Sequence, residues 1–120
     1  MSRPSASAVA IAAIETSSIA QGTVVANAMV KTAVVDLVQA SPISPGRYWV
    51  LVGGEVASVR SAYQRGMDVV ADTLVGSLLI PQLHAMVLPA LMGTAPRADH
   101  DALGVIETLT AAAAFLAADK

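Results

Sequence analysis

The chain has 120 residues and a net charge of −2 at pH 7, and it is 55% hydrophobic but only 13% charged. This length has room for one modest domain, because a single core usually needs about 100 residues. The scattered Lys and Arg residues give no basic surface for nucleic acid or anionic lipid. A small monomer with so few charges would expose much apolar surface, so we expect neighbouring subunits to cover part of it.

The sequence also argues against a membrane span, a secretory signal and any site that needs cysteine. Residues 73–96 carry no charge, but three prolines and two glycines interrupt them, so we predict no membrane span. Because the N-terminus has no secretory signal pattern, we expect the protein to stay in the cytosol. The sequence has no cysteine, and it therefore has neither disulfides nor thiolate ligands for zinc or iron–sulfur clusters.

A strand followed by a helix is predicted at the start of the chain. Residues 8–14 are small, apolar and compatible with a strand, and Ser18 with Gln21 forms a capping-box pattern that starts a helix. Helical spacing predicts one buried stripe of this helix, formed by Ala26, Met29, Val30 and Ala33.

The next elements complete one domain. Residues 34–40 and 47–52 predict an antiparallel pair of strands, joined by a proline-stiffened loop at 41–46. Gly53-Gly54 ends the second strand, and the acidic Glu55 favours the start of a second helix. Its expected buried face is formed by Val56, Val59, Tyr63 and Val70.

A fourth strand at 73–80 and a short helix at 83–91 follow. The order of elements predicts an α+β fold of the ferredoxin-like βαββαβ type. In this fold a four-stranded antiparallel sheet carries its two main helices on one face.

The end of the chain repeats its beginning. Ile14-Glu15-Thr16 recurs as Ile106-Glu107-Thr108, an offset of 92 residues, and the same offset aligns Ser18 with Thr110. Chance similarity between two alanine-rich segments is the alternative explanation, but polar and apolar positions both match. We therefore expect a domain at 8–92, a linker at 93–100, and the start of a second copy at 101–120. The second copy stops inside its first helix, so the strand at 102–108 and the helix at 111–118 are expected to be uncovered, as in a fragment of a longer tandem protein.

No catalytic or metal-binding pattern is found. His84 and His100 have no metal-ligand spacing, and surface or hydrogen-bonded histidines are the expected alternative. Ser44 lies outside any nucleophile elbow, and Gly53-Gly54 lacks the lysine of a phosphate loop. Glu15 and Glu107 are expected to be solvated or to form hydrogen bonds between subunits. We predict no catalytic residue and no enzyme.

Several short motifs carry a family resemblance. The segments at 13–16, 27–31, 35–38 and 50–56, in this order, resemble the bacterial microcompartment shell domain, and the pattern extends over residues 9–80 without a gap. The segments at 43–46, 77–79 and 87–90, followed by the second copy, resemble more narrowly the tandem-domain, trimer-forming shell proteins of the propanediol-utilisation type, which hold an iron–sulfur cluster.

The resemblance implies a flat pseudohexameric tile of three two-domain chains, which assembles with other shell proteins around enzymes in the bacterial cytoplasm. It assigns Lys31 to the tile edge, with a solvated helix lysine as the alternative. It assigns a pore lining to Pro42, Ile43, Ser44, Pro45 and Gly46. Ser44 stands where shell proteins of this tandem type have a cluster-ligating cysteine, so we expect a polar pore for small metabolites and no cofactor. The competing hypothesis is an oligomeric ferredoxin-like module that binds a small regulatory ligand.

Overall fold

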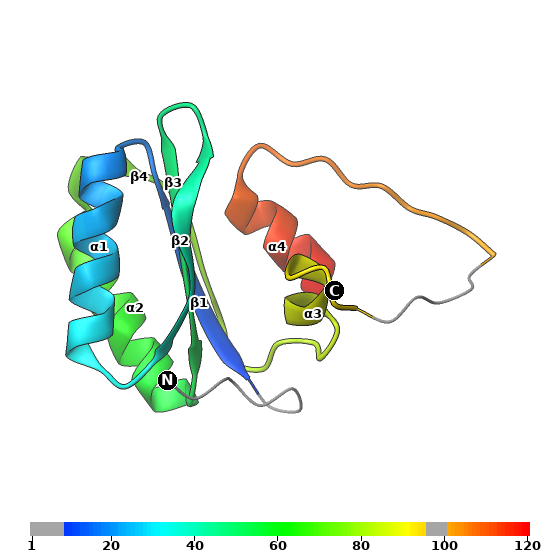
Figure 1. Ribbon diagram of the computed structural model, residues 1–120, viewed down its shortest axis with the longest axis horizontal. Coiled ribbons are helices and arrows are strands. Elements are labelled where there is room, and N and C mark those ends of the chain that lie inside the picture. The colour runs from blue at the N-terminus through cyan, green and yellow to red at the C-terminus, as the bar shows by residue number, and fades with distance from the viewer. Residues whose placement is uncertain (1–8, 96–100) are drawn as a thin grey trace.

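The computed structural model describes residues 9–95 and 101–120 (Figure 1). Four antiparallel strands form one sheet in the order β2-β3-β1-β4. Figure 1 shows helices α1 and α2 on one face of this sheet and α3 and α4 on the other. The elements are β1 (Ala10–Thr16), α1 (Ile19–Thr32), β2 (Asp36–Ser44), β3 (Arg47–Gly54), α2 (Val56–Val70), the 3-10 turn Ala71–Thr73, β4 (Leu74–Ile80), α3 (Val87–Leu91) and α4 (Ala111–Asp119).

This architecture confirms the predicted ferredoxin-like fold. Strand β1 lies in the middle of the sheet, and each of its seven residues is buried. Because side chains alternate along a strand, Ile11 and Ala13 face α3 and α4, whereas Ala12 and Ile14 face α1 and α2. The sheet therefore has an apolar core on both faces.

Helix α1 begins where the sequence predicts. Ser18 is its N-cap, and the Ser18 hydroxyl accepts a hydrogen bond of 3.1 Å from the Gln21 N–H. The Gln21 side chain does not complete a capping box, because its amide donates to the carbonyl of Val69 instead. This bond ties the start of α1 to the end of α2.

The buried stripe of α1 was predicted one helical turn too far along the helix, although its members Ala26 and Met29 are buried as predicted. Gly22, Val25, Ala26 and Met29 face the sheet. Val30 is exposed because it lies about 100° around the helix from Met29, and Ala33 lies outside the helix as its C-cap.

Helix α2 shows a similar difference. Its buried residues are Val59, Ala62, Gly66 and Val70, whereas Val56, which precedes the first sheet-facing turn, is exposed. Tyr63 is half-buried, with its hydroxyl 2.9 Å from that of Ser77. A Cβ atom at Gly66 would lie 2.5 Å from Ile14 Cδ1, so this glycine allows α2 to pack closely on β1.

The predicted loop at 41–46 is mostly strand. Strand β2 continues to Ser44, and only Pro45 and Gly46 form the turn, with Gly46 at a φ of 73°. Pro42 is tolerated because β2 is an edge strand, where a missing N–H can face away from the ladder. The proline-containing segment is therefore the end of a β-hairpin.

Residues 101–120, predicted as the start of a second copy, differ from the expectation in two ways. Residues 102–108 have no strand partner and do not form a strand, because a strand needs a neighbour for its backbone hydrogen bonds. The predicted helix forms as α4, but it is not uncovered: it packs against β1 and β4. The short helix predicted at 83–91 is limited to α3, and residues 96–100 of the predicted linker, with His100, lie outside the described residues.

Candidate assembly surface and pore hairpin

The β2–β3 hairpin carries the predicted pore residues at its tip. Ser44 is the last residue of β2 and pairs with Arg47, the first residue of β3. Residues 42–46 are all exposed. In Figure 1 the hairpin extends beyond the two helix layers, so its tip is available for contacts with other molecules.

A polar hollow of about 540 Å³ lies beside this tip. Its polar lining residues come from the end of β1, from the hairpin and from the segment that precedes α4, and they are Glu15, Ser44, Arg47, Thr108 and Thr110. The structure thus brings Ser44 close to the repeat, although the two are far apart in the sequence.

Glu15 is buried, so the expectation of a solvated carboxylate is wrong. Its side chain is 3% exposed, and Oε2 accepts a hydrogen bond of 3.1 Å from the Arg47 guanidinium. Its other oxygen, Oε1, accepts a hydrogen bond of 2.9 Å from the N–H of Ala111, the first residue of α4. Helix N-termini have N–H groups without intrahelical acceptors and attract negative charge. Glu15 therefore caps a helix that lies 96 residues further along the chain.

Helix α4 packs on three neighbouring residues of the sheet. Glu15 of β1 pairs with Trp49 on β3 and with Gly76 on β4, so Trp49, Glu15 and Gly76 form a row across the sheet, which we call the docking row. The Trp49 and Phe115 ring centroids are 6.2 Å apart. A Cβ atom at Gly76 would lie 3.4 Å from the Cβ of Ala112, so the missing side chain leaves space for α4.

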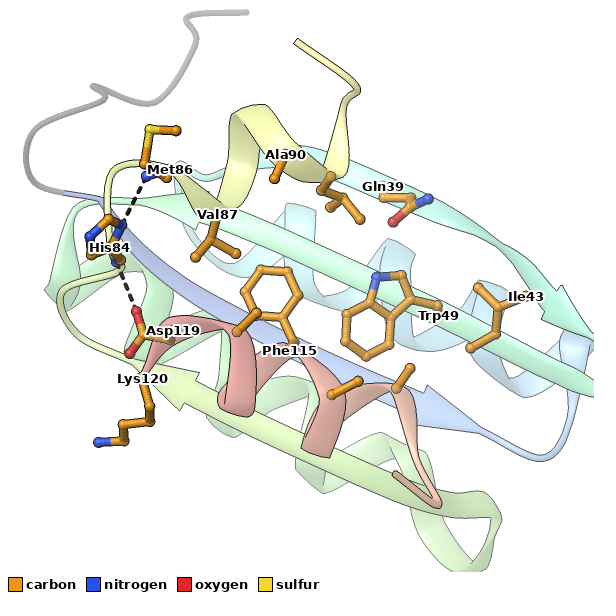
Figure 2. A pocket seen from close by; sticks show the side chains of 14 residues that line it. Gln39, Ile43, Trp49, His84, Met86, Val87, Ala90, Phe115, Asp119 and Lys120 are labelled. Carbon is orange, nitrogen blue, oxygen red and sulfur yellow. Dashed lines mark hydrogen bonds between the residues drawn. The ribbon is translucent and has the colours of Figure 1, made fainter. Parts of the chain in front are cut away.

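An open apolar groove of about 720 Å³ runs between α3, α4 and the sheet (Figure 2). Figure 2 shows Trp49, Val87 and Phe115 along it and His84 at one end. His84 is a hydrogen-bonded surface residue, as expected. Its ring Nδ1 accepts from the backbone N–H of Met86 at 3.1 Å, and the backbone N–H of His84 donates to the Asp119 carboxylate at 2.8 Å.

Lys31 lies far from the hairpin tip. It is exposed in the last turn of α1, just before β2 begins. Strand β2 has nine residues, and a strand rises about 3.3 Å per residue. The predicted edge residue and the predicted pore residues therefore lie at opposite ends of the domain (Figure 1).

The residues at the hairpin tip do not fit an iron–sulfur cluster. Such clusters are held by cysteine thiolates, whereas the tip supplies a serine hydroxyl and the chain has no cysteine. Within residues 9–95 and 101–120, no group of three or more His, Asp or Glu side chains could hold a metal ion.

In the same two ranges, no helix is both long and apolar enough to cross a membrane.

Sequence reasoning missed the docking row and its contact with α4. The recurring Ile-Glu-Thr tripeptide was the available signal, because it places an acidic residue three positions before each N-cap. It did not indicate that the first glutamate would cap the second helix, since that contact depends on tertiary packing.

The comparisons agree with the fold and the motifs. A sequence model of the BMC domain matches residues 10–83. The bacterial microcompartment shell protein PduT of Citrobacter freundii is 40% identical over 111 residues, which make up 92% of this chain and 60% of that protein. The crystal structure of a microcompartment protein from Desulfitobacterium hafniense DCB matches with a TM-score of 0.76 and 35% identity, over 92% of this chain and 62% of that chain. The chain thus spans less than two thirds of the length of either relative. It belongs to the BMC domain family of bacterial microcompartment shell proteins.

Proposed function

We propose that the protein is a non-enzymatic shell subunit that assembles into pseudohexameric tiles by head-to-tail packing of its domains. In such packing, the first helix of one domain lies on the open sheet face of the next. Contacts of this kind join different surfaces of the two partners, and they produce a ring when the rotation closes.

The docking of α4 on the docking row is the observation that carries this proposal. At the offset of 92 residues, α4 is the counterpart of α1. Ala112 and Phe115 of α4 are buried against the sheet, whereas their counterparts Ala20 and Thr23 are exposed on α1. The opposite face behaves inversely: Gly22 and Ala26 of α1 are buried, but Ala114 and Ala118 of α4 are exposed.

Each helix thus uses one of two faces. The buried face of α1 packs on the sheet of its own domain, and the buried face of α4 packs on the sheet of the preceding domain. We propose that every first helix in the assembled protein uses both faces. The exposed face of α1 then packs on the sheet of the second domain of another chain, because α4 already covers the sheet face of the first domain.

We propose that the full-length protein has two such domains, so that three chains supply the six domains of a ring, and the exposure of the segment before α4 supports this second domain. Leu103 and Ile106 are 91% and 70% exposed, whereas their counterparts Ile11 and Ile14 are fully buried in the first domain. The sheet of a complete second domain would bury Leu103 and Ile106 in the same way, so that no apolar strip would stay exposed.

The positions of the hairpin and of Lys31 fit a tile. A ring built from the α1 and sheet faces would bring the hairpin tips of all domains toward its axis, where Pro42, Ile43, Ser44, Pro45 and Gly46 would line a pore for small polar metabolites. Lys31, at the other end of the domain, would then face neighbouring tiles and other shell proteins in the bacterial cytoplasm, around the enclosed enzymes.

Sedimentation velocity of the full-length protein, in which the proposed second domain is complete, tests the assembly into rings. We expect particles of three chains, and we expect Thr23→Arg to dissociate them, because an arginine on this face cannot pack against the apolar sheet without burying a charge. Thr32→Arg is the matched control, since Thr32 is exposed on the same helix but outside the docking face. A monomeric wild type, or equal behaviour of the two variants, would refute head-to-tail packing.

The apolar groove favours one second candidate, a ligand-binding regulatory module. A groove of about 720 Å³ is large enough for a small organic molecule. A ligand-dependent rise in melting temperature, together with failure to form rings, would favour this function over the shell subunit.

A further inference from the structure

The contact between Glu15 and α4 points to an equivalent contact between chains. We propose that the Glu107 carboxylate caps helix α1 of a second copy of this chain by accepting a hydrogen bond from the Ile19 N–H. This inference rests on the proposed head-to-tail assembly and adds the pair of residues that sets its register.

The turns that lead into α1 and α4 have the same internal hydrogen bonds. The Thr16 hydroxyl donates to the Ser18 carbonyl at 2.6 Å, and the Thr108 hydroxyl donates to the Thr110 carbonyl at 2.8 Å. Thr110 Oγ1 also accepts from the N–H of Ala113 at 3.1 Å, as Ser18 Oγ does from Gln21. The repeat therefore extends from residue types to local geometry.

This correspondence assigns counterparts to both partners of the Glu15 contact. Shifted by 92 residues, Glu15 becomes Glu107, and Ala111 becomes Ile19, the first residue of α1. The partner that Glu15 finds is missing for Glu107, which is exposed. The N–H of Ile19 likewise has no acceptor among the described residues, and the Ile19 side chain is 46% exposed.

The two open groups complement each other. An exposed carboxylate and a helix whose first N–H has no acceptor have the same chemistry as the pair that is joined inside the chain. They cannot meet within one chain if α1 stays on its own sheet, because α1 and the segment 101–110 lie on opposite sides of that sheet (Figure 1). A second copy can supply the partner. Its α1 would then lie on the sheet of the second domain that contains Glu107, as α4 lies here on the sheet of the first domain.

The association of full-length variants tests this contact. Removal of a helix cap weakens the helix end by an amount equivalent to about a tenfold change in an equilibrium constant. We expect Glu107→Ala to raise the concentration at which rings dissociate by about tenfold or more. Glu107→Gln keeps an acceptor oxygen and should give a smaller change. Asp101→Ala, which removes an exposed carboxylate from the same segment, should give none.

Site-specific cross-linking gives an independent measurement, because these 120 residues contain no native cysteine that would compete with the introduced pair. With a short bis-maleimide, the variant Glu107→Cys/Ile19→Cys should give products that join different chains. Glu15→Cys/Ala111→Cys should cross-link within one chain, and Asp101→Cys/Ile19→Cys should react much less.

The outcomes separate this inference from the proposed function. If Glu107→Ala rings are as stable as the wild type, or if assembled Glu107→Cys/Ile19→Cys gives no product between chains, the Glu107 cap is wrong while the ring remains. If the wild-type protein is monomeric, the head-to-tail assembly itself is wrong, and this inference fails with it.

Discussion

Glu15 is a residue whose environment is explained by a segment nearly a hundred positions away. Carboxylates are seldom buried unless they are paired, and here each oxygen has a donor, from Arg47 and from Ala111. Arg47 is 40% exposed, so solvent screens its attraction and the ion pair alone stabilises the fold little. The burial of Glu15 depends on α4 covering it.

The first prediction concerns Glu15→Ala. The change removes a charged acceptor from the α4 N-terminus, and hydrogen bonds to charged groups contribute about 1.5–3 kcal/mol each. We expect the free energy of unfolding to fall by about 2 kcal/mol and Trp49 to become more accessible to solvent. Urea denaturation followed by tryptophan emission measures both effects.

Two variants act as controls for this prediction. Glu15→Gln keeps an oxygen that can accept from Ala111 and should lose less stability than the alanine variant. Glu107→Ala, which changes the exposed counterpart, should leave the unfolding curve of the single chain unchanged. Equal curves for Glu15→Ala and the wild type would contradict the capping role.

At the scale of elements, α1 and α4 have matching caps but opposite faces in use. Helix α4 has nine residues, and an isolated helix this short is not stable in water. It therefore depends on the contact of Phe115 with Trp49 and on the space above Gly76. The same dependence would link the folding of each first helix to the presence of a neighbouring sheet.

The second prediction concerns Phe115→Ala. The loss of a buried aromatic side chain usually costs about 3 kcal/mol or more. A helix as short as α4 cannot stay on the sheet after a loss of this size. We expect α4 to leave the sheet, with a loss of helical circular dichroism and a red shift of the emission of Trp49, the only tryptophan of the chain.

Leu116→Ala is the matched control, because Leu116 is the next residue of the same helix and is 45% exposed. It should keep the emission spectrum of the wild type. If Phe115→Ala also keeps it, α4 does not depend on the docking row.

The sequence was sufficient for the order of the elements up to α3 and for the cap of α1, whereas the strand predicted at 102–108 does not form. Periodicity gave the buried face of α1 only within one turn, as Val30 shows, because a shift of four residues turns the stripe by only about 40° around the helix. The extent of β2 through Pro42 was missed because local sequence does not reveal that β2 is an edge strand. The docking of α4 was missed for a similar reason, since composition does not indicate which of two apolar sheet faces is open.

At the scale of the whole molecule, the proposed functional residues lie at the two ends of one domain. The hairpin with Ser44 is at one end of β2, and Lys31 precedes its other end. This separation would allow ring formation and lateral assembly to be changed independently.

The third prediction concerns Lys31→Asp in the full-length protein. An exposed helix charge contributes less than about 1 kcal/mol to the stability of one chain, but it would be repeated at every contact between tiles. We expect extended sheets to disappear while rings and the melting temperature remain unchanged. Arg60→Asp, a charge reversal at an exposed position of α2, should leave the sheets intact. Sheets that form equally well with Lys31→Asp would remove this residue from the tile edge.

We propose that this BMC domain builds a ring by placing first helices on open sheet faces. Electron microscopy of the purified full-length protein, with two-dimensional averaging of single particles, tests it most directly. We expect flat particles with six domains around a central opening, in which the hairpin tips surround that opening. Isolated single chains, or rings in which the hairpin tips point outward, would contradict it.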